Sequence, residues 1–183
     1  MRKLFLPLSS MIAVLAGGAV AAAAEDGNWK EYVYPGDDFA ISAPAEPSLE
    51  KRTIHAAGGD SEAHVYAMPA GKNGAFMIVV NSRSDSDRRT DQEVLDEARV
   101  GVLREANAMV LVQSNVSLGR YRGAQLELES TEPGGKNKRV SDRFFVVGRK
   151  LYQLMALATP GYALPPDTER WLDSFRLVGK EGQ

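Results

Sequence analysis

Residues 75–80 read Ala-Phe-Met-Ile-Val-Val, a segment that is apolar at every position. A strand of this composition is typical of the centre of a sheet, where both faces are buried. The hairpin predicted over 144–157, around a Gly148-Arg149 turn, is apolar on both faces as well. The strand predicted over 124–130 instead alternates apolar and polar residues, so one of its faces is expected to meet water. A sheet with a doubly buried centre needs cover on two sides.

Two amphipathic segments can provide this cover. Thr90 and Glu93 have the spacing of a capping box, which predicts a helix that begins at this point and ends near Asn107. A second helix is predicted to begin near Pro165-Pro166-Asp167, with its two aromatic residues on one face. Each helix can therefore cover one face of the sheet.

The rest of the chain is predicted to consist mainly of hairpins. Strands are expected over 31–34, 39–43, 52–57, 62–67, 109–116, 124–130, 140–147 and 151–158, with 176–178 as a candidate last strand. The sequence has no internal repeat and no long linker, so residues 25–183 are predicted to form a single domain. The fold class that follows is α+β, an α/β/α sandwich in which a mostly antiparallel, hairpin-rich sheet is flanked by two main helices.

The first 24 residues have the three parts of a cleavable signal peptide. Arg2 and Lys3 precede an apolar segment over 4–20, and Ala22-Ala23-Ala24 offers a cleavage site after Ala24. The alternative is an uncleaved membrane anchor, but alanine and glycine dominate the second half of the segment and partition weakly into lipid. We therefore expect a bacterial protein that the general secretory route exports to the periplasm or beyond.

Composition and charge narrow the classes of partner. The chain has no cysteine and a formal net charge of −2, which becomes more negative when Arg2 and Lys3 are removed. A mildly acidic protein is a poor match for nucleic acid or for an anionic membrane surface. No second apolar run is long enough to span a bilayer, so no stable membrane insertion is expected after cleavage.

The two histidines form a candidate metal site. If Gly59-Asp60 is the two-residue turn of the hairpin, His55 and His64 lie directly opposite each other, with Cβ atoms about 5 Å apart. If Gly58-Gly59 is the turn instead, His55 faces Glu62 and the pair is lost. Two ligands are few for zinc, which prefers three or four, so solvated histidines are the competing interpretation.

A basic cluster near the penultimate hairpin is a candidate surface for an acidic partner. It consists of Lys136, Lys138, Arg139 and Arg143. Runs of charge of this length are commonly solvated, which is the competing interpretation.

No motif in the sequence predicts catalysis or a cofactor. The chain has no cysteine nucleophile and no Gly-x-Ser-x-Gly elbow. Asp85-Ser86-Asp87 begins like a calcium loop, but Arg89 stands where an oxygen ligand is needed, so we expect a solvated loop. The sequence therefore favours a protein that is not an enzyme and that has no cofactor.

Three segments resemble the PsbP-like α/β/α sandwich family. They are Phe39-Ala40-Ile41-Ser42-Ala43-Pro44, Leu151-Tyr152-Gln153-Leu154 and the closing segment from Trp171 to Leu177. The order of hairpins, helix, strands and helix is also similar, and the resemblance extends from Phe39 to Leu177. The family includes photosystem lumenal subunits, a factor that binds the GTPase Ran, and exported bacterial proteins of unknown role.

The resemblance implies a fold and, by analogy, a non-catalytic accessory role. The function expected from the sequence is therefore an exported binding or accessory module that acts through an envelope protein. The alternative is a periplasmic metal- or small-ligand-binding protein that uses the His55/His64 hairpin.

Overall fold

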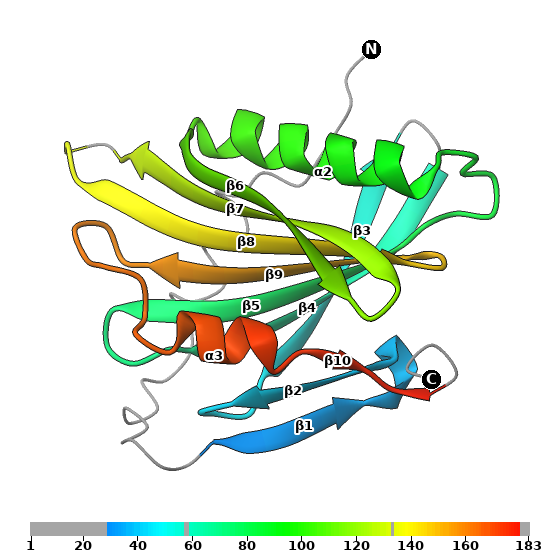
Figure 1. The fold of residues 1–183 in the computed structure, drawn as a ribbon, viewed down its shortest axis with the longest axis horizontal. Coiled ribbons are helices and arrows are strands. Elements are labelled where there is room, and N and C mark those ends of the chain that lie inside the picture. The colour runs from blue at the N-terminus through cyan, green and yellow to red at the C-terminus, as the bar shows by residue number, and fades with distance from the viewer. Residues whose placement is uncertain (1–28, 57–58, 133, 180–183) are drawn as a thin grey trace.

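The computed structural model describes residues 29–56, 59–132 and 134–179 (Figure 1). Within them lie two helices, a short 3-10 turn and ten strands. Their bounds are β1 Lys30–Tyr34, η2 Pro35–Asp37, β2 Phe39–Ala43, β3 Ser48–Ala56, β4 Gly59–Pro69, β5 Gly74–Ser82, α2 Asp91–Ala106, β6 Met109–Leu118, β7 Tyr121–Thr131, β8 Asn137–Val147, β9 Lys150–Ala158, α3 Thr168–Asp173 and β10 Arg176–Leu177. The predicted signal peptide lies outside the described residues. Among the described residues, no helix is long and apolar enough to cross a membrane.

Seven of the strands form one antiparallel sheet in the order β3-β4-β5-β9-β8-β7-β6. The doubly apolar strands β5, β8 and β9 occupy its centre, and nearly all of their residues between Ala75 and Val80 and between Phe144 and Val147 are buried. The predicted central strands are therefore confirmed. The pairing of β5 with β9 brings together segments that are separated by α2 and three strands, and it moves β6 to one edge of the sheet and β3 to the other.

Two apolar clusters lie on opposite faces of this sheet. The first cluster joins the sheet to α2 through Val94, Leu95, Ala98 and Val102. The second joins it to α3, whose Trp171 ring stacks on Phe76 with the centroids 4.5 Å apart. Helices thus pack on both faces, and the predicted α+β sandwich is confirmed (Figure 1).

The second face has a cover that the sequence did not predict. Strands β1, β2 and β10 form a separate antiparallel sheet in the order β1-β2-β10. Its Phe39 and Ile41 are fully buried in the same cluster as Trp171. The reason is size, because α3 has six residues and is too short to cover a seven-stranded sheet alone.

The capping prediction for α2 is confirmed. The Thr90 side chain accepts a hydrogen bond from the backbone N–H of Glu93, and the Glu93 carboxylate accepts one from the backbone N–H of Thr90. At the other end Asn107 adopts the left-handed conformation, with φ 44°, and ends the helix. The chain therefore leaves α2 abruptly and enters β6 two residues later.

Candidate functional site

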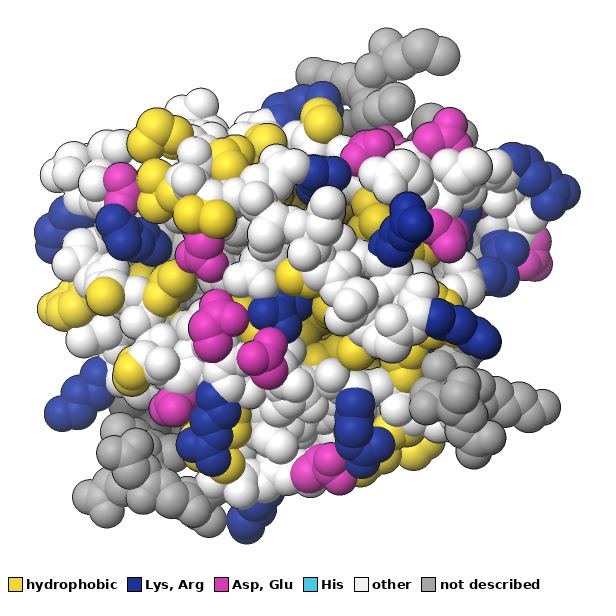
Figure 2. Space-filling model, viewed as in Figure 1, with side chains coloured by type: hydrophobic (Ala, Val, Ile, Leu, Met, Phe, Trp, Pro, Cys, Tyr) yellow, Lys and Arg dark blue, Asp and Glu magenta, His cyan; other side chains and the backbone are white. Residues whose placement is uncertain are grey.

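The first half of β6 carries an exposed apolar surface. Met109 is 61% exposed, Leu111 42% and Val112 55%, and Val110 is 36% exposed. Hydrophobic side chains gather at this end of the molecule, at the upper left of Figure 2, over the start of β6. We call the segment Met109–Val112 the β6 edge.

The position of β6 makes this surface unusual. It is the last strand of the large sheet, and no strand within the described part of the chain pairs with its outer side. The opposite edge strand, β3, carries Glu50, Lys51 and Arg52. Charges on an edge strand are a common protection against unwanted strand pairing. No charged residue lies between Glu105 and Arg120, so β6 lacks that protection along its whole length.

The local structure explains why the exposed apolar residues lie in the first half of β6. A bulge interrupts its pairing with β7 between Val110 and Val112. Beyond the bulge, Val116 and Leu118 pack against the second core cluster. The exposed apolar residues are therefore confined to the segment that directly follows α2.

Asp37 and His64 form the centre of a second candidate site, and this one is polar. The Asp37 carboxylate is buried, and one of its oxygens, Oδ2, lies 2.5 Å from the Tyr66 hydroxyl and 2.6 Å from His64 Nδ1. His64 Nε2 lies 2.6 Å from a Glu62 oxygen. Lys150 Nζ donates to the Gly36 carbonyl at 3.1 Å, so β4 and β9 together hold the turn between β1 and β2.

The hairpin of the two histidines has a register that differs from both predicted ones. His64 lies opposite Lys51, and His55 lies opposite Asp60. Since His55 is four residues along the strand from Lys51, the two histidines are about 13 Å apart along the hairpin rather than face to face. Both ring nitrogens of His64 already contact carboxylates, and the side chain of His55 lies outside the description. The metal hypothesis thus loses the geometry from which it was predicted.

The four basic residues of the predicted acidic-partner surface do not come together. Lys136 and Arg139 are exposed, and Arg139 pairs with Glu129 at 3.0 Å. Lys138 is buried, and its neighbours Arg139 and Arg143 point to the other face of the strand. Arg143 is also buried, and it binds Asp173 of α3 at 2.8 Å and Gln125 of β7 at 2.9 Å. These contacts fix α3 on the sheet.

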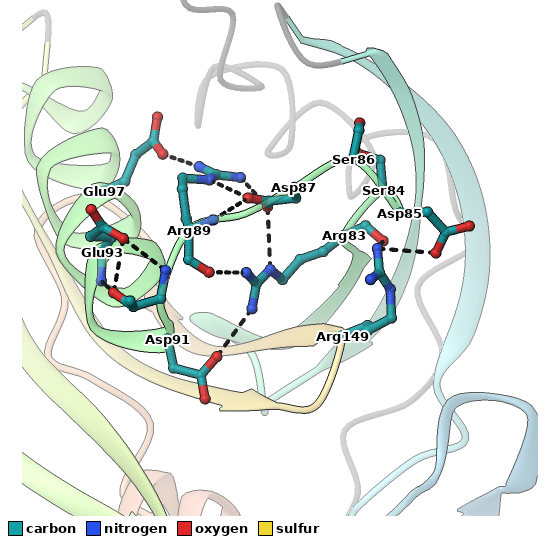
Figure 3. Close-up of polar contacts among 11 residues, drawn as sticks. Arg83, Ser84, Asp85, Ser86, Asp87, Arg89, Asp91, Glu93, Glu97 and Arg149 are labelled. Atoms are coloured by element: carbon teal, nitrogen blue, oxygen red, sulfur yellow. Dashed lines mark hydrogen bonds and ion pairs between the residues drawn. The ribbon is translucent and has the colours of Figure 1, made fainter.

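The loop from β5 to α2 contains a network of ion pairs (Figure 3). Asp87 lies between Arg83 and Arg89, which are 3.2 and 2.6 Å from its Oδ2 atom. Hydrogen bonds from Arg89 hold the pKa of the Asp87 carboxyl far below its usual value, although burial opposes the shift. Arg89 also contacts Glu97 of α2, and Arg83 contacts Asp91 at 3.1 Å. Asp85 is fully exposed as predicted, whereas Asp87 is not solvated and helps to position the start of α2.

Asp142 is a buried carboxyl group on the α2 side of the sheet. It is 0% exposed, and its Oδ2 accepts a hydrogen bond from Gln153 at 2.8 Å. Its Oδ1 has no hydrogen-bond partner among the described residues. Burial raises the pKa of this carboxyl well above its usual value, and the Gln153 hydrogen bond offsets only part of that rise. A carboxyl group in such a place keeps its proton to a higher pH than an exposed one does.

Sequence reasoning located the strand that contains the β6 edge but did not identify it as a site. The strand predicted over 109–116 is confirmed as β6 over Met109–Leu118. The signal that could have found the edge is the long uncharged run after a helix, which begins with the four apolar residues Met109–Val112. His64 was selected for metal binding, whereas its partner Asp37 is a buried residue of the turn between β1 and β2.

The comparisons with known proteins support the fold. No protein-family model and no curated protein sequence matches the chain. The structure is similar to that of cyanobacterial PsbP (CyanoP) from Synechocystis sp. PCC 6803, with a TM-score of 0.52 and 12% identity over 89% of this chain and 98% of that one. A protein from Bacteroides thetaiotaomicron is similar with a TM-score of 0.50 and 14% identity over 84% of this chain and 50% of that one. The predicted PsbP-like fold is confirmed, and at these identities the similarity concerns the fold alone.

Proposed function

We propose that this protein is an exported, non-enzymatic binding module that acts through a protein partner, and that the partner docks on the β6 edge. The observation that carries the proposal is the row of exposed apolar side chains on an uncharged edge strand whose outer side pairs with no strand in the described part of the chain. An exposed apolar patch on a folded protein marks a surface that another molecule covers. A protein partner is supported over a membrane by the strand's open backbone, which lipid cannot hydrogen-bond.

The compartment in the proposal comes from the N-terminal sequence. Arg2, Lys3 and the apolar segment that follows have the features of a secretory signal. We expect the mature chain to begin at Glu25 and to be recovered from the periplasmic fraction or the medium. Mass spectrometry of the protein from those fractions tests this, and a full-length protein in the membrane fraction would contradict it.

A set of three exposed valines provides a matched test of the docking surface. Val112 is 55% exposed on β6, Val100 is 51% exposed on α2, and Val33 is 49% exposed on β1. Each is changed to lysine in a tagged protein, which is cross-linked in cells and purified. We expect one stoichiometric protein to co-purify with the wild type, V100K and V33K, and to be lost from V112K because a charge must be desolvated there.

Equal thermal unfolding temperatures of the three variants serve as the folding control. The proposal is overturned if no protein co-purifies with the wild type, or if all three variants retain the partner equally. Loss of the partner from V33K or V100K, with V112K unaffected, would show that the docking surface lies on β1 or α2 instead of β6.

A further inference from the structure

We infer that the partner supplies an extended segment, uncharged where it pairs, which adds to β6 as a further strand of the seven-stranded sheet. This inference rests on the proposed function, because it specifies how the partner occupies the β6 edge. Three features of the described residues support it: the backbone of the edge, the side chains that flank it, and the place where α2 ends.

The backbone of β6 favours a partner segment in the extended conformation of a β-strand. In an edge strand, every second residue directs its N–H and C=O groups away from the sheet. On either side of the bulge between Val110 and Val112, these groups lie about two residues apart in a row, and an extended chain is the structure that can bind them in series. A helix could cover the apolar side chains of Met109 and Val112, but it would leave these backbone groups without partners.

The side chains beside the edge call for an uncharged segment. Met109 and Val112 lie next to Glu129 and Glu127 of β7. Glu129 is already paired with Arg139, and Glu127 accepts a hydrogen bond from Ser141 at 2.6 Å. Glu129 therefore already has a cation as its partner, and the Glu127 carboxylate has a hydrogen-bond donor within the sheet. Because β6 itself has no charge, β-branched and other apolar residues are the best cross-strand neighbours.

The geometry of β6 disfavours a second copy of this chain as the occupant. Two copies can bring their β6 edges together in an antiparallel pair with two-fold symmetry. Only Met109–Val112 of each copy can then pair, because the chain turns into α2 at Asn107 and the paired segment cannot extend in that direction. A two-fold pair over all ten residues instead places Val110 opposite Ser117 and Val112 opposite Asn115. An extended segment of another protein is free of both restrictions and can pair with β6 on either side of its bulge.

Two substitutions at one position separate strand addition from side-chain docking. V112T keeps a β-branched, uncharged residue of similar shape, whereas V112K introduces a charge. The partner recovered by co-purification is used as the probe, and its affinity for the full mature chain is measured with each variant. We expect V112T to bind within about threefold of the wild type, and V112K to lose at least about tenfold in affinity, since each tenfold is about 1.4 kcal/mol.

Hydrogen exchange of the β6 backbone amides completes the experiment. We expect the alternate amides of β6 that face away from β7 to exchange at least about tenfold more slowly in the complex than in the free protein. If the amides are unchanged, or if V112T loses as much affinity as V112K, strand addition is wrong although the partner still binds at β6. If V112K binds as tightly as the wild type, the proposed docking surface fails as well. A self-associated chain without any partner in sedimentation, with protected β6 amides, would identify a second copy as the occupant and overturn the inference.

Discussion

His64 is the residue whose chemistry the structure determines most closely. Both of its ring nitrogens lie 2.6 Å from a carboxylate oxygen, one of Asp37 and one of Glu62. A neutral imidazole has one N–H and one lone pair, so it can donate to only one of the two. The imidazolium form donates to both. The geometry therefore assigns a charged His64 that joins the β1–β2 turn to β4.

The charge on His64 predicts a pH dependence of stability. Burial lowers the pKa of His64, but the hydrogen bonds to Asp37 and Glu62 outweigh it, so the pKa lies above its usual value of 6.5. When folding raises the pKa of a base, the folded state is stabilised at pH values below the pKa of the unfolded chain. This stabilisation is lost as the pH rises through the pKa of the folded state. We expect H64Q to be less stable than the wild type at low pH, with the difference shrinking as the pH rises.

Urea unfolding between about pH 5 and 9 tests this prediction. The chain has one other histidine, so H55Q is the matched control and should keep the pH dependence of the wild type. A difference between wild type and H64Q that stays constant with pH would show that His64 does not carry the charge.

Replacing the Asp142 carboxyl is expected to change stability with pH in the opposite direction to replacing His64. A carboxyl group whose folded pKa is raised stabilises the folded state at low pH, and that contribution is lost as the pH rises from the unfolded pKa through the folded one. D142N keeps an acceptor for Gln153 and removes the titration. We expect D142N and the wild type to have equal free energies of unfolding near pH 3.5. As the pH rises, D142N should become more stable than the wild type, by on the order of 1 kcal/mol for each unit by which the folded pKa of Asp142 exceeds its unfolded pKa. Equal free energies of unfolding at all pH values would contradict the account.

At the scale of elements, the start of α2 can be tested through its capping box. T90A removes the side-chain acceptor of the Glu93 N–H, which typically costs about 1 kcal/mol of stability. T90S keeps the hydroxyl and is the matched control. We expect the urea midpoint to fall for T90A and to remain close to the wild type for T90S. Equal losses in the two variants would mean that the cap contributes nothing to the stability of α2.

The sequence predicted the elements better than it predicted their ends and partners. The apolar run of β5 and the cap of α2 are local signals, and both predictions are confirmed. The predicted start of β7 was three residues late because Gly123 normally interrupts a strand. In the structure that glycine is required, since a Cβ there would lie 2.3 Å from the Phe144 carbonyl oxygen.

Features that depend on pairing between strands far apart in the sequence could not be predicted from local patterns. The turn of the β3–β4 hairpin falls in a run of small residues that allows several registers, and the observed register was not among those predicted. The edge position of β6 follows from the pairing of β5 with β9, which no local pattern determines. For the same reason, the burial of Asp37 against β4 and β9 could not be predicted from the turn residues around it.

At the scale of the whole molecule, the large sheet has two edges with opposite chemistry. The β3 edge carries charges of both signs, whereas β6 carries none and exposes apolar side chains. Charged edges discourage strand pairing and apolar ones permit it. We therefore propose that the sheet accepts another chain on one side only, and this asymmetry is the central claim of the proposed function.

A photo-cross-linking side chain placed at each edge in living cells tests that claim most directly. Position 112 samples β6 and position 49 samples β3, where Leu49 has a comparable exposure of 49%. The account predicts a single adduct of defined mass from position 112 and none from position 49. An adduct from position 49 alone, or no adduct from either position, would contradict it.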